Sequence, residues 1–170
     1  IRPPRPIREQ LLALMGGVSG ARWQSDDQLH VTLRFIGGVD ARVADDVASA
    51  LGALRHPAFA VALSGVGTFN RRGRAEVIWA GLRPHEPLEA LHRKVDQACV
   101  RAGLEPERRA YHPHITLARL KRDSTGPIGA FLENGAVSSP SFRVESFALY
   151  ESTLKPEGAV YTLVERYRLD

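Results

Sequence analysis

Hydrophobic and polar residues along this chain follow two spacings that alternate from one segment to the next. Apolar residues three or four positions apart predict helices at residues 7–15, 41–55, 87–102 and 127–134. β-Branched and apolar residues at a spacing of two predict strands at residues 28–36, 59–66, 75–82, 112–119, 142–151 and 159–168. Helices interleaved with strands and strand pairs indicate a mixed α+β fold.

Single residues mark the ends of several of these elements. Pro6 fits the first turn of the first helix, and Asp40 is expected to cap the second. Gly135 is expected to end the fourth helix. The strands at 59–66 and 75–82 are expected to be joined by a loop, residues 67–74, that carries three arginines.

One short pattern occurs twice, and its two copies organise the chain. The segments His30-Val-Thr32-Leu and His114-Ile-Thr116-Leu stand 84 residues apart in a chain of 170. The same offset brings the first predicted helix onto the third and the second close to the fourth, so a strand–helix–strand–helix–strand unit is repeated. We expect residues 1–170 to form one bilobal α+β domain. Its two pseudo-symmetric lobes would be mainly antiparallel sheet, with helices packed outside and a cleft between them.

The repeat also predicts how the chain starts. The strand at 75–82 precedes the third helix, so subtracting 84 requires a strand that ends about two residues before Ile1. Ile1 would then be the tail of that strand. We expect the natural protein to begin with a strand that is largely absent from this sequence.

Each copy of the motif offers an imidazole and a hydroxyl on one face, because residues two apart in a strand point the same way. If the two strands face each other, His30, Thr32, His114 and Thr116 surround one site. Imidazoles on opposite sides of a substrate can act as general base and general acid, each contributing roughly 10²–10⁴-fold. Threonine hydroxyls suit a non-bridging phosphate oxygen. The set fits a phosphodiester, and neither proton transfer needs a metal.

The fifth residue after each histidine differs between the copies, being Phe35 in one and Arg119 in the other. Strict alternation turns both away from the histidine, so Arg119 reaches a phosphate only from a strand end or a β-bulge. The pattern by itself predicts that Phe35 lies in the core.

Two other functions fit the same residues. His112 shares a face with His114 and, together with His30, could hold the metal ion of a hydrolase. Alternatively, the pocket could bind an RNA end or a phosphate without turnover. The arginines of the 67–74 loop fit a solvated hairpin tip and a contact with an RNA backbone equally well. The remaining histidines are expected at the surface: His56, His85 and His92.

Composition narrows the class of protein without identifying a partner. Hydrophobic residues make up 44% and charged residues 25% of the chain, as in ordinary soluble globular proteins. The net charge of +4 mildly favours an anionic partner. Cys99 is the only cysteine, which excludes an intrachain disulfide and a cysteine metal cluster and favours a cytoplasmic setting. No apolar run approaches the roughly 18 residues of a membrane span. We expect a monomer without a cofactor or a metal.

The doubled motif resembles that of the two-histidine phosphoesterase superfamily. Within it, His30–Gly37 and His112–Arg119 are similar to the RNA 2′,3′-cyclic phosphodiesterases, also called 2′-5′ RNA ligases, and the likeness extends to Val77–Gly81 and Leu149–Ser152. The resemblance implies metal-independent hydrolysis of RNA 2′,3′-cyclic phosphate ends, or of small cyclic nucleotides, to 2′-phosphomonoesters. Reversible 2′-5′ RNA ligation is the further activity that it implies.

The resemblance also implies roles for individual residues. His30 would match the acid for the 3′ leaving oxygen, and His114 the histidine that activates water. Pseudo-symmetry leaves these two roles exchangeable. The residues implied to contact the substrate are Thr32, Thr116 and Arg119 at the phosphate and Phe35 near it.

Overall fold

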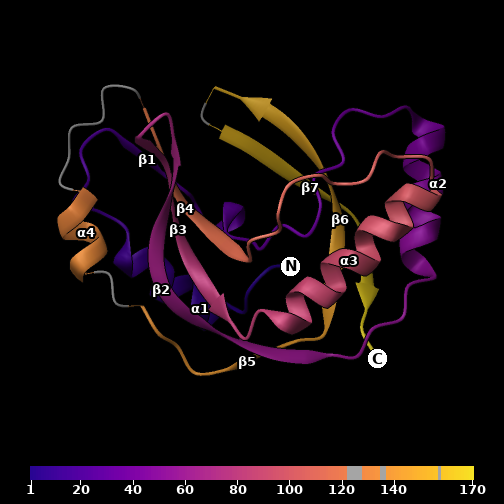
Figure 1. Cartoon of the computed structure of the whole chain (residues 1–170), viewed down its shortest axis with the longest axis horizontal. Helices are drawn as coiled ribbons and strands as arrows, with labels where there is room; N and C mark the ends of the chain where they lie inside the picture. The colour runs from indigo at the N-terminus through magenta and orange to yellow at the C-terminus, as the bar shows by residue number, and fades with distance from the viewer. Residues whose placement is uncertain (122–127, 135–136, 157) are drawn as a thin grey trace.

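Two antiparallel sheets form the frame of the protein in a computed structural model that describes residues 1–121, 128–134, 137–156 and 158–170 (Figure 1). The second sheet has two strands, β6 (Ser146–Lys155) and β7 (Gly158–Arg168). The first has five, in the spatial order β1 (Ala21–Trp23), β4 (His114–Leu120), β3 (Arg74–Arg83), β2 (Phe59–Arg71) and β5 (Phe142–Val144).

The helices divide between the two sheets (Figure 1). On the side of the five-stranded sheet lie α1 (Arg5–Leu14) and α4 (Ile128–Asn134), the latter through ring contact between Phe131 and Trp23 of β1. On the side of the two-stranded sheet lie α2 (Ala41–Gly52) and α3 (Glu86–Arg101), with α2 joined to β7 by a hydrogen bond from the Tyr167 hydroxyl to the Ala48 carbonyl. The expected bilobal α+β architecture is therefore confirmed.

The internal repeat is visible in the order of the elements. Adding 84 to the bounds of β3 gives residues 158–167, which lie within β7. Likewise, the β2–β3 hairpin corresponds to the chain from β5 to β7. The two lobes are nevertheless unequal, because the strand is interrupted at Glu145: β5 pairs with β2, whereas β6 pairs with β7. The single strand predicted at 142–151 is thus two strands.

The strand predicted at 28–36 is wrong except at its centre. Only Val31 pairs, by an isolated antiparallel bridge to Ile115 on one side and by two backbone hydrogen bonds of 2.8 Å with Ile1 on the other. A short 3-10 turn, η1 (Asp26–Gln28), precedes it. After it, the Leu33 carbonyl bonds the His92 ring rather than a neighbouring strand. A side chain, the His92 ring, therefore bonds this segment where a regular strand would pair with a neighbouring backbone.

The loop predicted at 67–74 is also wrong, because β2 continues to Arg71 and only Arg72 and Gly73 form the turn. Their φ angles are +52° and +76°, as a two-residue hairpin turn with positive φ at both positions requires. Gly67 suggested a turn in the sequence, yet it lies in a strand. A Cβ there would stand 2.3 Å from the Trp79 ring, so this glycine makes room for the indole.

Elsewhere, the capping residue predicted from the local sequence is confirmed. The Asp40 side chain accepts the Val43 N–H at 2.9 Å, which confirms it as the cap of α2. Gly135 and Pro127, at the ends of the predicted fourth helix, lie outside the described residues. Within the described part of the chain, no helix is both long and apolar enough to cross a membrane.

Candidate active site

The two His-x-Thr segments lie side by side. The bridge between Val31 and Ile115 joins the central residues of the two triplets. In an antiparallel pair the flanking residues oppose each other, so His30 lies across from Thr116, and Thr32 across from His114. Val31 and Ile115 are buried in the hydrophobic core, at 2% and 0% exposure. The two imidazoles and two hydroxyls therefore share the opposite face, as the sequence predicted.

The backbone fixes both imidazole rings in the same way. His30 donates from Nδ1 to the Gln28 carbonyl, and His114 from Nδ1 to the His112 carbonyl, each at 2.7 Å. A carbonyl only accepts, so Nδ1 carries the hydrogen and Nε2 of each neutral ring is left with a lone pair. His30 Nε2 lies 3.1 Å from the Thr32 hydroxyl. Each ring thus presents the nitrogen that can take up or give a proton.

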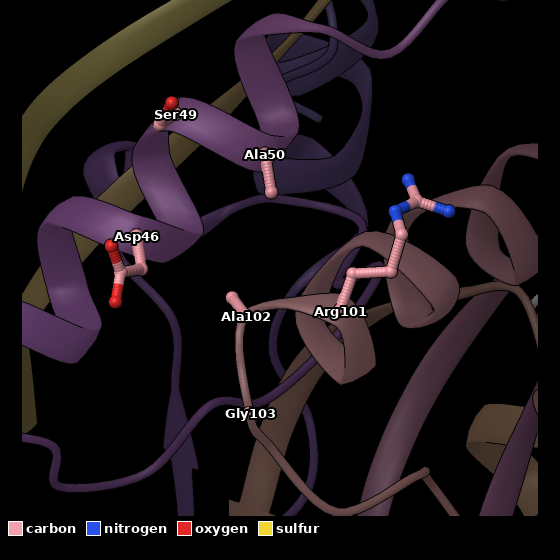
Figure 2. A pocket seen from close by; sticks show the side chains of 6 residues that line it. All are labelled: Asp46, Ser49, Ala50, Arg101, Ala102 and Gly103. Carbon is pink, nitrogen blue, oxygen red and sulfur yellow. The ribbon is translucent and has the colours of Figure 1, made fainter.

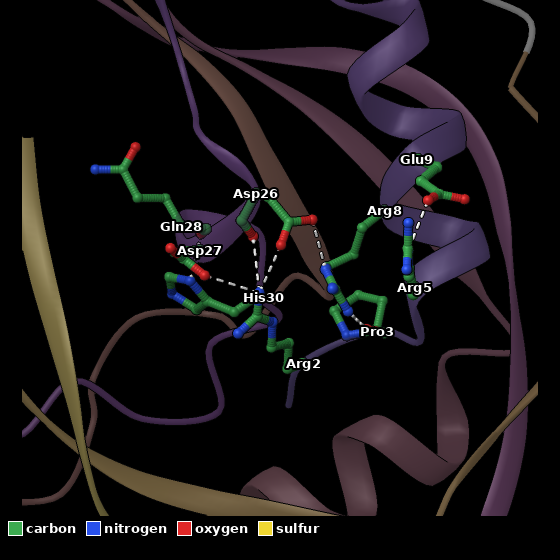
Figure 3. Close-up of polar contacts among 9 residues, drawn as sticks. All are labelled: Arg2, Pro3, Arg5, Arg8, Glu9, Asp26, Asp27, Gln28 and His30. Carbon is green, nitrogen blue, oxygen red and sulfur yellow. Dashed lines mark hydrogen bonds and ion pairs between the residues drawn. The ribbon is translucent and has the colours of Figure 1, made fainter.

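Ion pairs hold the turn that supplies the Gln28 carbonyl (Figure 3). Asp26 of η1 pairs with Arg8 Nε at 2.7 Å and with Arg2 Nη2 at 2.7 Å. The hydrogen bond from Arg8 is the main cause that lowers the pKa of the Asp26 carboxyl. The α1 end of the chain therefore positions His30 through the turn, a role that the hydrophobic pattern of the sequence does not reveal.

Aromatic rings from both sheets flank the histidines. Tyr161 of β7 meets the His30 ring edge-on, with ring centroids 4.9 Å apart. Phe69 of β2 meets the His114 ring in the same way at 4.8 Å. Trp79 of β3 stands opposite Thr116 in the strand register. The site therefore lies where the two lobes meet, and the rings limit how each imidazole can turn.

The environment of the histidines favours their neutral forms. Burial is the main cause that lowers the pKa of His30 from 6.5 to about 4, and the positive charge of Arg119 acts in the same direction. Burial likewise is the main cause that lowers the pKa of His114, and the charge of Arg119 acts in the same direction, against the hydrogen bond to the His112 carbonyl, which raises it. Both imidazoles are uncharged at neutral pH in the free protein. A bound phosphate would oppose these causes, because opposite charge raises a histidine pKa.

Arg119 joins the histidines through a β-bulge, as the alternation argument required. In the β3–β4 register, Trp79 pairs with Thr116 but Ile78 pairs with Ala118, so Leu117 is the extra residue. The bulge turns the next side chains over, and Leu117 and Ala118 are consecutively buried at 0% exposure. Arg119 opposite Val77 consequently lies on the same face as Thr116. Its charge acts on both imidazoles.

Three other sequence predictions come out differently. Phe35 is 72% exposed, so the prediction of a core position is wrong and the ring is accessible. His56 is 6% exposed rather than on the surface. His92 is half-buried, bonds the Leu33 carbonyl at 2.7 Å and stacks on Tyr111 with centroids 4.1 Å apart. His92 therefore ties the segment after the first motif to α3.

The residues do not assemble the metal site considered as an alternative. In the described ranges, no group of three or more His, Cys, Asp or Glu side chains is arranged to hold a metal ion. The ring centroids of His112 and His114 are 6.3 Å apart, and His112 contacts Trp79 instead, at 4.9 Å. The metal-hydrolase hypothesis therefore lacks a ligand set here.

Two surface hollows lie away from the histidines. One, of about 510 Å³, separates α2 from the end of α3 and is lined by Asp46, Ser49 and Ala50 on one side and Arg101, Ala102 and Gly103 on the other (Figure 2). The other, of about 330 Å³, is lined by the residues that enter α3, Arg83 to Glu86. Neither of these two hollows contains a residue of the His-x-Thr motifs.

Paired His-x-Thr segments at the junction of two lobes define a two-histidine phosphoesterase type of site. Comparison with known proteins specifies the family. The family model of the 2′-5′ RNA ligase superfamily matches residues 3–155, and the chain belongs to that superfamily.

Two related proteins and one solved structure illustrate the match. The RNA 2′,3′-cyclic phosphodiesterase of Aeropyrum pernix is 35% identical over 144 residues, covering 82% of this chain and 82% of that protein. The RNA 2′,3′-cyclic phosphodiesterase of Escherichia coli is 31% identical over 171 residues, covering 98% and 92%. The crystal structure of E. coli LigT complexed with 3′-AMP has a TM-score of 0.76 at 30% identity, covering 98% of this chain and 92% of that one.

Proposed function

We propose that this protein hydrolyses RNA 2′,3′-cyclic phosphate ends to 2′-phosphomonoesters without a metal ion. The observation that carries the proposal is the bridge between Val31 and Ile115, which brings two oriented imidazoles and two hydroxyls to one face. The activity named for the relatives, RNA 2′,3′-cyclic phosphodiesterase, supports the same reaction. Reversible 2′-5′ ligation is a further proposed activity, and it fits the family description.

The proposed reaction is a direct attack of water on the cyclic phosphorus. One neutral imidazole accepts a proton at Nε2 as the water oxygen bonds to phosphorus. The P–O3′ bond breaks, and the second imidazole, protonated at Nε2, gives its proton to O3′. Thr32, Thr116 and Arg119 would donate to the non-bridging oxygens, where negative charge develops. The exposed Phe35 would contact the nucleoside.

The family resemblance makes His30 the acid and His114 the base. In the free site, however, the pKa of His30 is lowered to about 4, so His30 is uncharged until substrate binds. The proposal therefore requires the phosphate, with its negative charge, to raise the His30 pKa before the acid step. The alternative assignment exchanges the two roles, and the pseudo-symmetric Nδ1 hydrogen bonds suit either.

An oligoribonucleotide with a 2′,3′-cyclic phosphate end, incubated with the protein in EDTA, tests the proposal. We expect a 2′-phosphate product, and a loss of at least roughly 100-fold in rate for His30→Asn and for His114→Asn with unfolding midpoints unchanged. Arg101→Ala, an exposed arginine at the end of α3, is the matched surface control. A 3′-phosphate product or complete loss of activity in EDTA would contradict the proposal.

The same assay distinguishes the proposed enzyme from the binding-module alternative. A protein that only binds RNA ends would retain its ligand without product over long incubation, and its affinity would fall steeply with salt. RNA ends and small cyclic nucleotides are the proposed substrates, since neighbouring structures are complexes of LigT with nucleotides. We also propose that the protein is a monomer and that it works in the cytoplasm, and the single cysteine favours that compartment.

A further inference from the structure

The chain from Ala21 to Thr32 runs along one edge of β4 in a single antiparallel track. Ala21, Arg22 and Trp23 pair with Leu120, Arg119 and Ala118. The Gln24 N–H then bonds the Leu117 carbonyl at 2.8 Å. After η1 loops out, Val31 rejoins the same edge opposite Ile115. The sequence analysis did not predict β1. Because β1 pairs with β4, Arg22 and His30 both lie along the same edge of β4.

Arg22 points to the same face as the histidines. In an antiparallel pair, directly opposed residues share a face, so Arg22 lies on the side of Arg119. The adjacent residue, Trp23, packs on the other side against Phe131 of α4. The cross-strand row Arg22–Arg119–Val77–Phe69 therefore runs beside the row that contains His30 and Thr116.

In the part of the chain that the structure describes, the two arginines lie opposite each other without a compensating carboxylate. Among the described residues, neither guanidinium has an acidic partner within ion-pair distance, whereas Arg2, Arg5, Arg8 and Arg34 all do. Like charges directly opposite on neighbouring strands destabilise a sheet. Such a pair is favourable when an anion lies between or beside the two groups, and an arginine fork fits phosphate oxygens.

We propose that Arg22 binds the phosphodiester that precedes the terminal nucleotide, so that the Arg22–Arg119 pair holds two successive phosphates of an RNA end. This inference rests on the proposed function and extends it from the cyclic phosphate to the RNA chain. Arg119 serves the cyclic phosphate and Arg22 the next phosphate along the strand. RNA ends would consequently be preferred over single cyclic nucleotides.

The position of Arg22 explains why it serves the second phosphate and not the first. Arg119 lies on the central strand β4, between Arg22 on β1 and Val77 on β3, and its charge acts on both His30 and His114. The Nη1 of Arg22 lies 3.9 Å from the place where a Cβ of Gly158 would stand, at the start of β7. The Arg22–Arg119 row is roughly 7–10 Å along β4 from the Thr116 row, at about 3.3 Å per residue. That spacing suits a neighbouring phosphate of the same strand.

Two substrates distinguish a contact with the cyclic phosphate from a contact with the preceding phosphodiester. Adenosine 2′,3′-cyclic phosphate carries only the cyclic phosphate, and the trinucleotide ApApA with a 2′,3′-cyclic end carries two phosphodiesters as well. For Arg22→Ala we expect kcat/KM to fall roughly 10-fold or more on the trinucleotide and to change less than about twofold on the mononucleotide. Arg22→Lys should recover part of the loss, since it keeps the charge but not the fork. Arg101→Ala should alter neither value.

An uncharged linkage in place of the last internal phosphodiester tests whether Arg22 contacts that phosphate. A trinucleotide whose last internal linkage is a methylphosphonate should lower wild-type kcat/KM as much as Arg22→Ala does, and should lower the variant no further. Equal loss on both substrates would place Arg22 at the cyclic phosphate and overturn the proposal. An unchanged trinucleotide rate, or additive losses with the methylphosphonate, would overturn it too.

A binding measurement keeps this test separate from the proposed function. If the wild-type protein turns over neither substrate, the proposed function fails, but affinity for a trinucleotide ending in 2′-phosphate still reports on Arg22. The slope of log affinity against log salt should then be smaller in Arg22→Ala by about 0.7, the value for one phosphate contact on a single strand. An unchanged slope would contradict the contact.

Discussion

Val31 and Ile115, which stand 84 residues apart, pair with each other across an antiparallel bridge. An antiparallel pair of equivalent residues is related by a local twofold axis that passes between them. The internal repeat therefore has its axis inside the candidate site, and each motif completes the other. Neither half of the chain could present both imidazoles by itself.

The bulge at Leu117 turns Arg119 toward the histidines, so the Arg119 charge should affect their pKa values. Because the Arg119 guanidinium lowers the pKa of both His30 and His114, Arg119→Gln should raise both pKa values. Titration of the histidine Hε1 signals by NMR measures this directly. Arg101→Gln, on the far end of α3, should leave both unchanged. Unshifted values in Arg119→Gln would mean that the side chain points away from the histidines, as strict alternation had required.

Burial of His30 makes the fold sensitive to acid. Its pKa is lowered from 6.5 to about 4 in the folded protein, so the unfolded chain binds the proton more readily between these values. The resulting stability is fully present above pH 6.5 and is lost as the pH falls toward 4. From pH 7 to pH 5 the loss attributable to this ring is roughly 2 kcal/mol.

Urea unfolding at the two pH values measures that loss. In His30→Gln, the free energy of unfolding should fall less between pH 7 and pH 5 than in the wild type, by about the same roughly 2 kcal/mol. The other histidines are present in both proteins and cancel in the comparison. An identical pH dependence in the two proteins would show that His30 titrates normally in the fold.

Sequence reasoning succeeded where the signal was local or repeated. Asp40 caps α2 because a cap depends only on the next few residues. The His-x-Thr pair was identifiable because its two copies share an offset. The Gln28 and His112 carbonyls, which orient the two rings, also stand 84 residues apart. The same offset could therefore have identified these two residues from the sequence.

Sequence reasoning failed where a distant partner decides the structure. Gly67 looks like a turn residue until Trp79 is seen to occupy the space of its missing side chain. The bulge at Leu117 exists only in the register with β3, and no local pattern announces it. The segment around Val31 has the alternation of a strand, but its backbone pairs at one residue. Phe35 is a large apolar residue of the kind usually found in a core, yet its side chain is exposed.

The close approach of Gly67 and Trp79 predicts a graded effect of one methyl group. In Gly67→Ala the new Cβ would stand 2.3 Å from the Trp79 ring, so the indole must move. We expect a loss of roughly 1–3 kcal/mol in the free energy of unfolding and a change in tryptophan fluorescence. Gly38→Ala is the control, because nothing lies within 4 Å of its added Cβ and its φ is not positive. Equal stability of the two variants would contradict the packing.

Two ion pairs of equal length but different burial give the last prediction. Arg34 Nε lies 3.2 Å from Asp96 Oδ1, and Arg143 Nε lies 3.2 Å from Glu145 Oε1. The Arg34 side chain is only 9% exposed and also pairs with Glu107, whereas the Arg143 side chain is 65% exposed. Arg34 follows the first motif, so this pair ties that segment to α3.

Burial should make the first pair the costly one to break. Arg34→Ala leaves two carboxylates, 19% and 27% exposed, without their partner and should cost roughly 1–3 kcal/mol of unfolding free energy. Arg143→Ala should cost less than about 1 kcal/mol, because water already screens that pair. Denaturant unfolding of both variants makes the comparison, and Arg34→Lys should remain destabilised because one ammonium cannot replace the fork. Similar costs for the two alanine variants would mean that Arg34 is solvated in solution and does not anchor the segment after His30.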